Sequence, residues 1–292
     1  MPYDAWHEAR KAHHARVDGW IADRQSRASR KAPNAVFDFL FTYYSLRPSH
    51  LGRWSPGFDV VLEGGAPEAC DWPQDFVGCR EGAVLPGRNF PPHRLRYLEW
   101  AIRYLSAVRE RAPSFSCFGL HEWAMLYRTD DIRHSQTPLR VSKHQISSAV
   151  EELGLRCSHF DAFRFFTSEA APLNKQRLSR ESTTESDQRA CIHVTMDLYK
   201  FAYKIAPWCP SDIVAEAFLL AADARTIDMR ASPYDLSAMG LAPICIETAA
   251  GRQEYVQEQR RLSELSTPIR DRLLSVYELL GLCCAGDRSP PP

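Results

Sequence analysis

The sequence lacks the signatures of several protein classes. No C-x-x-C pair occurs among its nine cysteines, so a structural zinc knuckle is not expected. No apolar run approaches the ~18 residues of a membrane-spanning helix, and the first residues contain no apolar signal region. Cysteines scattered inside apolar runs, such as Cys117 and Cys191, are typical of reduced thiols. We therefore expect a cytoplasmic protein without a membrane partner.

An excess of charge of one sign is also absent. The 36 Lys and Arg residues balance 36 Asp and Glu residues, which gives a formal net charge of zero. Nucleic-acid binders usually carry a basic excess, because neutralising phosphates supplies most of their non-specific affinity. The charge balance therefore does not support a nucleic-acid partner, although a local basic patch stays open. The G-x-S-x-G elbow, the G-x-x-x-x-G-K-[ST] phosphate loop and the G-x-G-x-x-G fingerprint are missing as well.

Hydrophobic residues make up 45% of the chain and recur at helical spacing, without alternation of strands and helices. Gly154 is expected as a helix C-cap and Ser211 as an N-cap. The sequence predicts a single mainly α-helical bundle over residues 1–286, with a frayed tail at 287–292. The expected helices cover residues 4–31, 35–45, 93–112, 120–128, 142–153, 191–206, 212–230, 251–265 and 268–280, the last two separated at Pro268.

Two long segments have little helical pattern. Residues 52–93 are rich in Gly and Pro, and only Phe58–Glu63 is expected to form a strand. Residues 167–189 form a polar loop. Long loops in compact domains usually have a function, so we expect the 52–93 insertion to cover one end of the bundle.

The clearest candidate for metal chemistry is the pair His193 and Asp197. The i, i+4 spacing places both side chains on one helix face, about 6 Å apart. They fit a metal site or an oriented imidazole–carboxylate pair, and equally a histidine bonded to its own neighbour. On the next helix, Glu216, Asp223 and Asp228 are either further acidic ligands or a solvated helix edge.

Two more histidine–carboxylate pairs lie in the segment from Cys117 to Phe166. His121 and Glu122 begin an apolar helix and point ~100° apart, so one faces a pocket and the other supports it. A capping Glu beside a core His is the alternative. His159 and Asp161 precede an aromatic run that could hold a planar ring by stacking, unless Asp161 simply pairs with Arg164.

Five motifs resemble a bacterial family that carries the label 3-methyladenine DNA glycosylase. They are Asp38–Ser45, CFGLHEWAM from Cys117, CSHFDAFRFF from Cys157, MDLYK from Met196 and DMRASPYDL from Asp228. The resemblance implies hydrolysis of the N-glycosidic bond of a nucleobase-like substrate. It implies that Asp161 or Glu122 activates water beside His159, and that the base is held by Trp123, Tyr127, Phe160, Phe163 and Arg164.

Two other functions stay open at this point. The first is a metal-dependent enzyme that binds iron, manganese or zinc through His121, His193 and Asp197. Further ligands in this hypothesis are Glu122, His159 and either Glu216 or Asp228. The second is a non-catalytic helical binding protein. We expect His121, His159 and His193 to meet in one pocket built from three segments, and this hypothesis fails if they lie apart.

Overall fold

The computed structural model describes residues 1–32 and 34–285. Over these residues the prediction of one mainly α-helical domain is confirmed, with a single small sheet. The α-helices are α1 (Tyr3–Ser29), α2 (Phe39–Thr42), α3 (Pro48–Leu51), α4 (Leu95–Glu110), α5 (His121–Ala124), α6 (Lys143–Leu153), α7 (Phe160–Phe163), α8 (Thr183–Ser186), α9 (Ile192–Lys204), α10 (Ser211–Arg230) and α11 (Ala249–Ala285). The predicted frayed tail lies outside the described residues.

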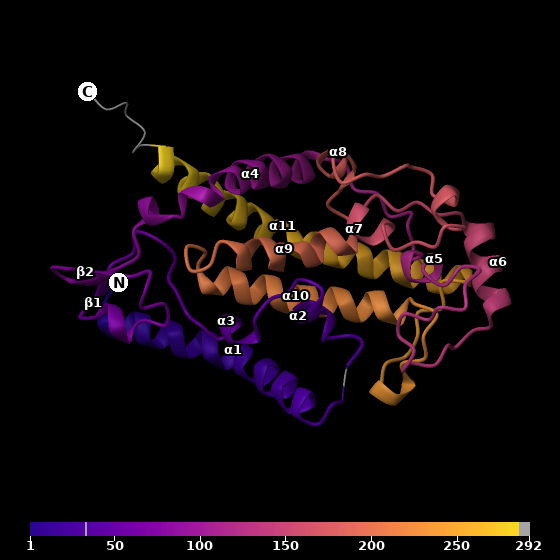
Figure 1. Cartoon of the computed structure of the whole chain (residues 1–292), viewed down its shortest axis with the longest axis horizontal. Helices are drawn as coiled ribbons and strands as arrows, with labels where there is room; N and C mark the ends of the chain where they lie inside the picture. The colour runs from indigo at the N-terminus through magenta and orange to yellow at the C-terminus, as the bar shows by residue number, and fades with distance from the viewer. Residues whose placement is uncertain (33, 286–292) are drawn as a thin grey trace.

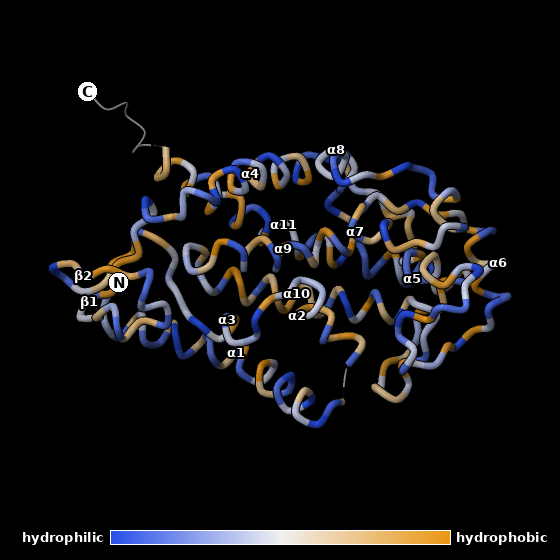
Figure 2. The backbone as a smooth tube through the Cα atoms, in the orientation of Figure 1, coloured by the Kyte–Doolittle hydropathy of each residue, from blue (hydrophilic) through white to orange (hydrophobic). Residues whose placement is uncertain are grey.

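Helices α9, α10 and α11 form the centre of the molecule, with α4 against α11 and α1 against α10 (Figure 1). α9 and α10 bury residues around most of their circumference, which is typical of interior helices. In Figure 2 hydrophobic segments accordingly recur along both. The outer helix α1 buries only Trp6, His13 and Val17. The central helices thus supply rigid positions for polar side chains in the interior.

The prediction of two helices separated at Pro268 was wrong, because α11 runs through it. Proline removes one backbone donor and crowds the preceding turn, which usually breaks a helix. Here the hydroxyls of Ser266 and Thr267 donate to the carbonyl of Ser263, at 2.7 and 3.1 Å. Ile269 and Leu273 are buried just beyond. These hydroxyls do not replace the bond that Pro268 cannot make to the Glu264 carbonyl, so buried packing is what keeps the helix continuous.

Two predicted helices are much shorter than expected. In the segment 35–45 only α2 is helical, and in the segment 120–128 only α5. Ser45 and Arg128 close these segments with positive φ angles of 53° and 50°. An L-residue with positive φ cannot continue a right-handed helix, so the backbone turns there. These turns bring both segments back towards α9 and α10.

One predicted cap is confirmed and one is wrong. Gly154 follows α6 with a φ of 69°, and Ser142 forms a capping box with Gln145 at its other end. Ser211 is instead the first residue of α10, with Pro210 before it. The Ser211 hydroxyl accepts from the backbone N–H of Ser55 at 2.8 Å. It therefore ties the Gly/Pro-rich segment to the core helix.

The Gly/Pro-rich segment contains more strand than predicted. Strands β1 (Leu62–Glu63), β2 (Val77–Cys79) and β3 (Gly82–Val84) form an antiparallel sheet in the order β1-β3-β2. A Cβ at Gly82 would lie 1.9 Å from the Leu62 carbonyl oxygen, so only glycine fits there. The sheet lies at the end of the molecule next to the N-terminus, away from α5 and α6 (Figure 1). Among the described residues, no helix combines the length and apolar character that a membrane span requires.

Candidate metal centre

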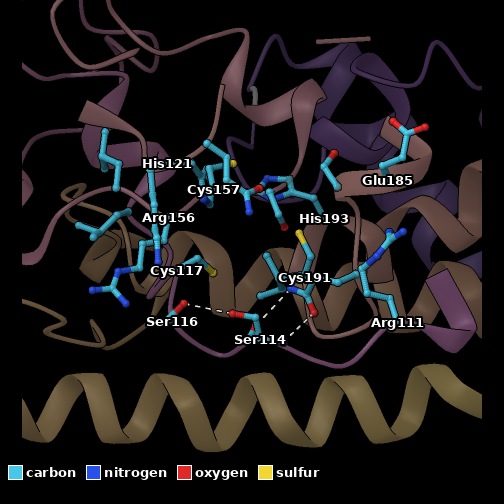
Figure 3. A pocket seen from close by; sticks show the side chains of 18 of the residues that line it. Arg111, Ser114, Ser116, Cys117, His121, Arg156, Cys157, Glu185, Cys191 and His193 are labelled. Carbon is cyan, nitrogen blue, oxygen red and sulfur yellow. Dashed lines mark hydrogen bonds between the residues drawn. The ribbon is translucent and has the colours of Figure 1, made fainter. Parts of the chain in front are cut away.

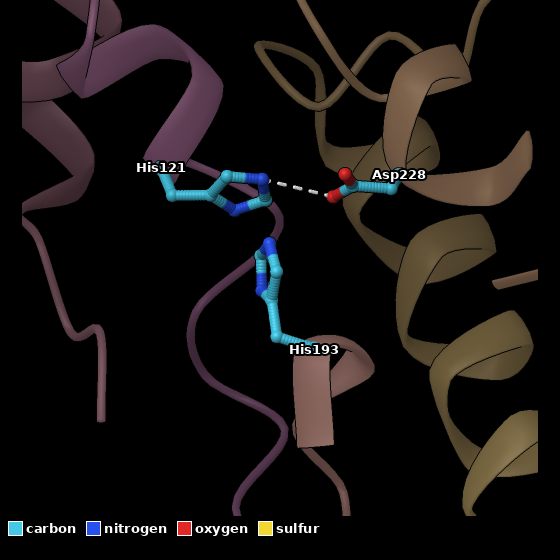
Figure 4. Close-up of side chains that lie close together, drawn as sticks. All are labelled: His121, His193 and Asp228. Atoms are coloured by element: carbon cyan, nitrogen blue, oxygen red, sulfur yellow. Dashed lines mark ion pairs between the residues drawn. The ribbon is translucent and has the colours of Figure 1, made fainter. Parts of the chain in front are cut away.

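Two histidines and one aspartate converge from three helices. His121 begins α5, His193 lies in the first turn of α9, and Asp228 lies near the end of α10. One ligand atom from each lies within 4.8 Å of the other two (Figure 4). Ligands of a bound metal stand ~2.0–2.2 Å from the ion, so atoms spread over 4.8 Å would have to move closer together to bind one ion.

His121 and Asp228 form an ion pair whose geometry is poor for a hydrogen bond (Figure 4). His121 Nε2 and Asp228 Oδ1 lie 3.0 Å apart, in the range of a hydrogen bond. Neither atom, however, has a hydrogen-bond partner with suitable direction among the described residues. Asp228 is fully buried and His121 is 7% exposed. Buried polar groups without such a partner are uncommon in native proteins and call for an explanation.

A tight turn places His121 in this position. Gly119, two residues earlier, has a φ of 69°. A Cβ on Gly119 would lie 3.1 Å from the Tyr255 ring and 3.3 Å from Ala231 Cβ. A larger residue would therefore be strained and would push the start of α5 away from α10. This glycine precedes His121 in the sequence, but nothing in the pattern showed which helix it approaches.

The second oxygen of Asp228 is held by a buried arginine. Arg225 Nη1 donates to Asp228 Oδ2 at 2.5 Å and to Glu122 Oε1 at 3.0 Å. Arg225 is only 1% exposed, and its guanidinium lies over the Phe39 ring at 4.2 Å. Glu122 is therefore the supporting neighbour of the trio. It points away from His121, as adjacent residues on a helix do.

The charges of this cluster set its ionisation. Burial alone would raise the pKa of Asp228, but the neighbouring His121 and Arg225 hold that pKa well below its usual range. Burial would lower the pKa of His121, but the Asp228 carboxylate outweighs it and raises the pKa. Burial and the nearby His121 both lower the pKa of His193, which keeps its imidazole neutral and able to act as a ligand.

His159 stacks on the trio without belonging to it. Its ring is nearly parallel to that of His193, with centroids 5.4 Å apart, while the His121 and His193 rings are 4.3 Å apart. The three histidines therefore lie close together, but His121 and His193 line two cavities that His159 does not line. His159 Nδ1 lies 3.1 Å from Asp187 Oδ1, and Tyr104 donates its hydroxyl hydrogen to Asp187 Oδ2 at 2.7 Å. His159 is thus oriented by a buried carboxylate of its own.

Asp197, the predicted partner of His193, lies elsewhere. Its two oxygens accept from the Tyr44 hydroxyl at 2.9 Å and from the Lys200 ammonium group. Burial would raise the pKa of Asp197, but Lys200 outweighs it and lowers the pKa. The geometry therefore replaces Asp197 by Asp228 in the candidate ligand set. The i, i+4 spacing was correct for the helix, but it could not show that other helices supply stronger partners.

The remaining acidic candidates on α10 form ion pairs. Glu216 pairs with Arg272 at 2.7 Å, and Asp223 pairs with Arg261 at 2.7 Å. Both carboxylates are about one-third exposed. They form the solvated helix edge that was the alternative expectation.

Two cavities open onto the trio, and both are lined by His121 and His193. The large cavity, about 670 Å³, also contains Glu122, Asp161 and Arg225 among its lining residues. The small cavity, about 300 Å³, contains the three cysteines Cys117, Cys157 and Cys191 (Figure 3). Burial raises the pKa of all three thiols, which is not the state of a reactive cysteine.

The aromatic residues that the family resemblance assigned to a base pocket are not among the lining residues of either cavity. Trp123 is fully buried and donates its indole N–H to the Ala231 carbonyl at 2.9 Å. The Tyr127 hydroxyl donates to Glu151 at 2.7 Å. Phe160 stacks with Arg180, Phe163 contacts Phe166, and Arg164 pairs with Asp161 at 3.1 Å. The rings that line the large cavity are instead Phe39, Tyr43 and Phe165.

The residues that hold the histidines and Asp228 in place are not equally easy to predict from the sequence. Arg225 and Asp228 are spaced i, i+3 on an apolar helix, which is a readable sign of a buried ion pair. Asp187 ends a polar loop and has no such sign.

Searches against protein-family models, curated proteins and solved structures found no match. Function is therefore inferred from the geometry of the site.

Proposed function

We propose that this chain binds one divalent transition-metal ion through His121, His193 and Asp228 and acts as a metal-dependent enzyme. The supporting observation is the pair of buried atoms, His121 Nε2 and Asp228 Oδ1, that face each other at 3.0 Å without hydrogen-bond geometry. Buried charges are normally paired by hydrogen bonds or coordinate a metal. An ion between these two atoms would satisfy both.

The chemistry of the donors favours particular metals. Two imidazoles and one carboxylate with open positions suit non-haem iron, manganese or zinc. A bound ion of this kind supplies Lewis acidity and lowers the pKa of a ligand water. Arg225 fixes the Asp228 carboxylate from the other side, as supporting hydrogen bonds do around metal ligands.

The large cavity is the natural place for the main substrate. Its volume of about 670 Å³ falls in the usual range for small-molecule sites, and it reaches His121 and His193. Glu122 Oε2 is buried and finds no hydrogen-bond partner among the described residues, and Glu122 lines this cavity. It is therefore an acceptor that a substrate N–H or O–H group would satisfy.

The decisive experiment measures bound metal. The full-length chain is purified without chelators or a histidine tag, and its metals are quantified by inductively coupled plasma mass spectrometry. About one equivalent of iron, manganese or zinc is expected. His193→Ala should lose it, whereas His13→Ala, which removes a buried histidine on α1, should retain it. Content far below one equivalent after reloading with each of these metals would refute the proposal.

A second candidate function is the N-glycosidic hydrolysis implied by the family resemblance. The observation that favours it is the charge of the large cavity, whose lining contains the carboxylates of Asp38, Glu122, Asp131 and Asp161 and three aromatic rings. Purines alkylated at a ring nitrogen are planar and cationic, which suits such a surface. In this function Asp161 or Glu122 activates the water.

Release of 3-methyladenine from alkylated DNA tests this candidate. Asp161→Asn is compared with the wild-type chain, and Glu151→Gln is the control because Glu151 pairs with Arg128 on the surface. Release that disappears in Asp161→Asn and persists after metal removal would favour the glycosylase over the metal-dependent enzyme. Equal release by the wild type and Asp161→Asn would exclude the role of Asp161.

A further inference from the structure

The two cavities that share His121 and His193 differ in charge. The lining of the small cavity contains the cations Arg111, Arg156 and Lys175 against one carboxylate, Glu185. The lining of the large cavity contains four carboxylates against two arginines. In the view of Figure 3, Arg156 and Arg111 flank the small cavity on opposite sides. His121 and His193 can thus be reached from the small cavity, which is basic, and from the large cavity, which is acidic.

We propose that the small cavity binds a small oxyanion, a carboxylate or a phosphate, as a second ligand next to the ion. This inference rests on the proposed metal site and extends it to a reaction with two substrates. The main substrate enters from the large cavity and the anion from the small one. A volume of about 300 Å³ lies at the lower end of the range for small-molecule sites and is enough for an anion of a few heavy atoms.

The charge of the buried cluster supports an anion. Without a metal, the carboxylates of Glu122 and Asp228 face the guanidinium of Arg225 and the imidazole of His121. With a divalent ion bound by neutral histidines, the two carboxylates would face the ion and the Arg225 guanidinium, which together carry three positive charges. The loaded cluster therefore carries an excess positive charge, which an anionic ligand would compensate in this desolvated place.

The small cavity also offers free hydrogen-bond donors. Ser186 Oγ is buried and has no partner among the described residues. No described carboxylate lies within ion-pair distance of Arg156 or Lys175. Charge-assisted hydrogen bonds to an oxyanion are roughly twice as strong as neutral ones, so these groups are suited to hold it.

The test uses the full-length, metal-loaded chain with pyruvate as the carboxylate probe and inorganic phosphate as the phosphate probe. Isothermal titration calorimetry compares the wild type with the double variant Arg156→Gln/Lys175→Gln. Arg133→Gln is the matched control, because Arg133 lines only the large cavity. We expect the double variant to weaken anion binding about tenfold or more and the control to leave it unchanged.

A second measurement asks whether the anion reaches the ion. Loading with Co²⁺ gives a visible absorption spectrum that should shift when the probe binds. The inference is overturned if the spectrum does not change, or if Arg133→Gln weakens binding while the double variant does not. Absence of bound metal would refute the proposed function itself, whereas loaded protein that ignores both probes would refute only the anion site. The probe with the larger shift identifies the anion class.

Discussion

The two buried aspartates on the central helices, Asp197 and Asp228, differ in how their carboxylate oxygens are paired. Asp197 on α9 has both oxygens satisfied, by the Tyr44 hydroxyl and the Lys200 ammonium group. Asp228 on α10 has one oxygen bound by Arg225 and the other facing an imidazole without hydrogen-bond geometry. Desolvation costs both carboxylates free energy that only partners can offset. The comparison indicates that Asp197 is fully satisfied within the protein, whereas one oxygen of Asp228 is available for the metal binding that we propose.

The largest expected difference is in metal content. Asp228→Asn removes a charged ligand and should reduce metal affinity by more than ~100-fold, since changes to mere supporting residues already cost 10–100-fold. Asp197→Asn should bind about one equivalent, as the wild type does. Mass spectrometry of both variants after dialysis decides it, and loss of metal in Asp197→Asn alone would reverse the assignment.

The second difference concerns the counter-ions. Lys200→Met leaves Asp197 buried without its cation and should lower the free energy of unfolding by about 3–5 kcal/mol. Arg225→Met likewise leaves the buried carboxylates of Glu122 and Asp228 without their arginine partner. Added metal should restore part of the stability of Arg225→Met and none of Lys200→Met. Urea unfolding with and without metal measures this, and equal recovery in both variants would contradict it.

The sequence predicted the helices that carry these residues better than the contacts between their side chains. The apolar periodicity located α9 and α10, and the histidine positions identified the segments that meet. Which carboxylate meets which histidine depends on how α10 packs against α9, on the turn at Gly119 and on Arg225. These are long-range contacts, and helical spacing cannot show them.

The same limit explains the errors in the fold. Pro268 was expected to end a helix from local propensity, but the buried residues around it keep α11 continuous. The family resemblance, and not a local sequence pattern, assigned the aromatic residues Trp123 and Tyr127 to a base pocket. In the structure their polar atoms bond to Ala231 and Glu151, which only tertiary contacts could supply.

Metal should also stabilise the folded chain. An ion that binds only the native state at 100 times its dissociation constant adds about 2.7 kcal/mol to the free energy of unfolding. The wild type and Asp197→Asn should both gain, and Asp228→Asn should not. Thermal unfolding with metal and then with excess chelator measures the gain and its reversal. A gain that persists in Asp228→Asn would place the ion elsewhere.

A smaller effect is expected at Asp197. Tyr44→Phe removes one hydrogen bond from Asp197 but leaves Lys200 in place. Loss of a hydrogen bond to a charged group should cost about 1.5–3 kcal/mol, towards the lower value because the phenyl ring still fills the space. Metal content should stay unchanged. Urea unfolding and metal analysis of the same preparation check both statements.

The smallest effect is a pH dependence at a buried histidine that has no carboxylate bonded to it. His13 Nε2 donates to the Leu51 carbonyl at 2.9 Å, and Nδ1 is buried without a partner among the described residues. Burial, aided by His14 and Arg16, lowers the pKa of His13, although the Leu51 carbonyl and Asp71 oppose this.

Because the unfolded chain then binds this proton more readily, His13 should reduce stability as the pH falls through the ordinary histidine pKa of 6.5. The loss should be complete below the lowered folded pKa. His13→Gln keeps an N–H donor for Leu51 but cannot titrate, so it should flatten this part of the pH profile. An unchanged profile of unfolding free energy between pH 7 and pH 5 in this variant would show that the effect arises at other groups.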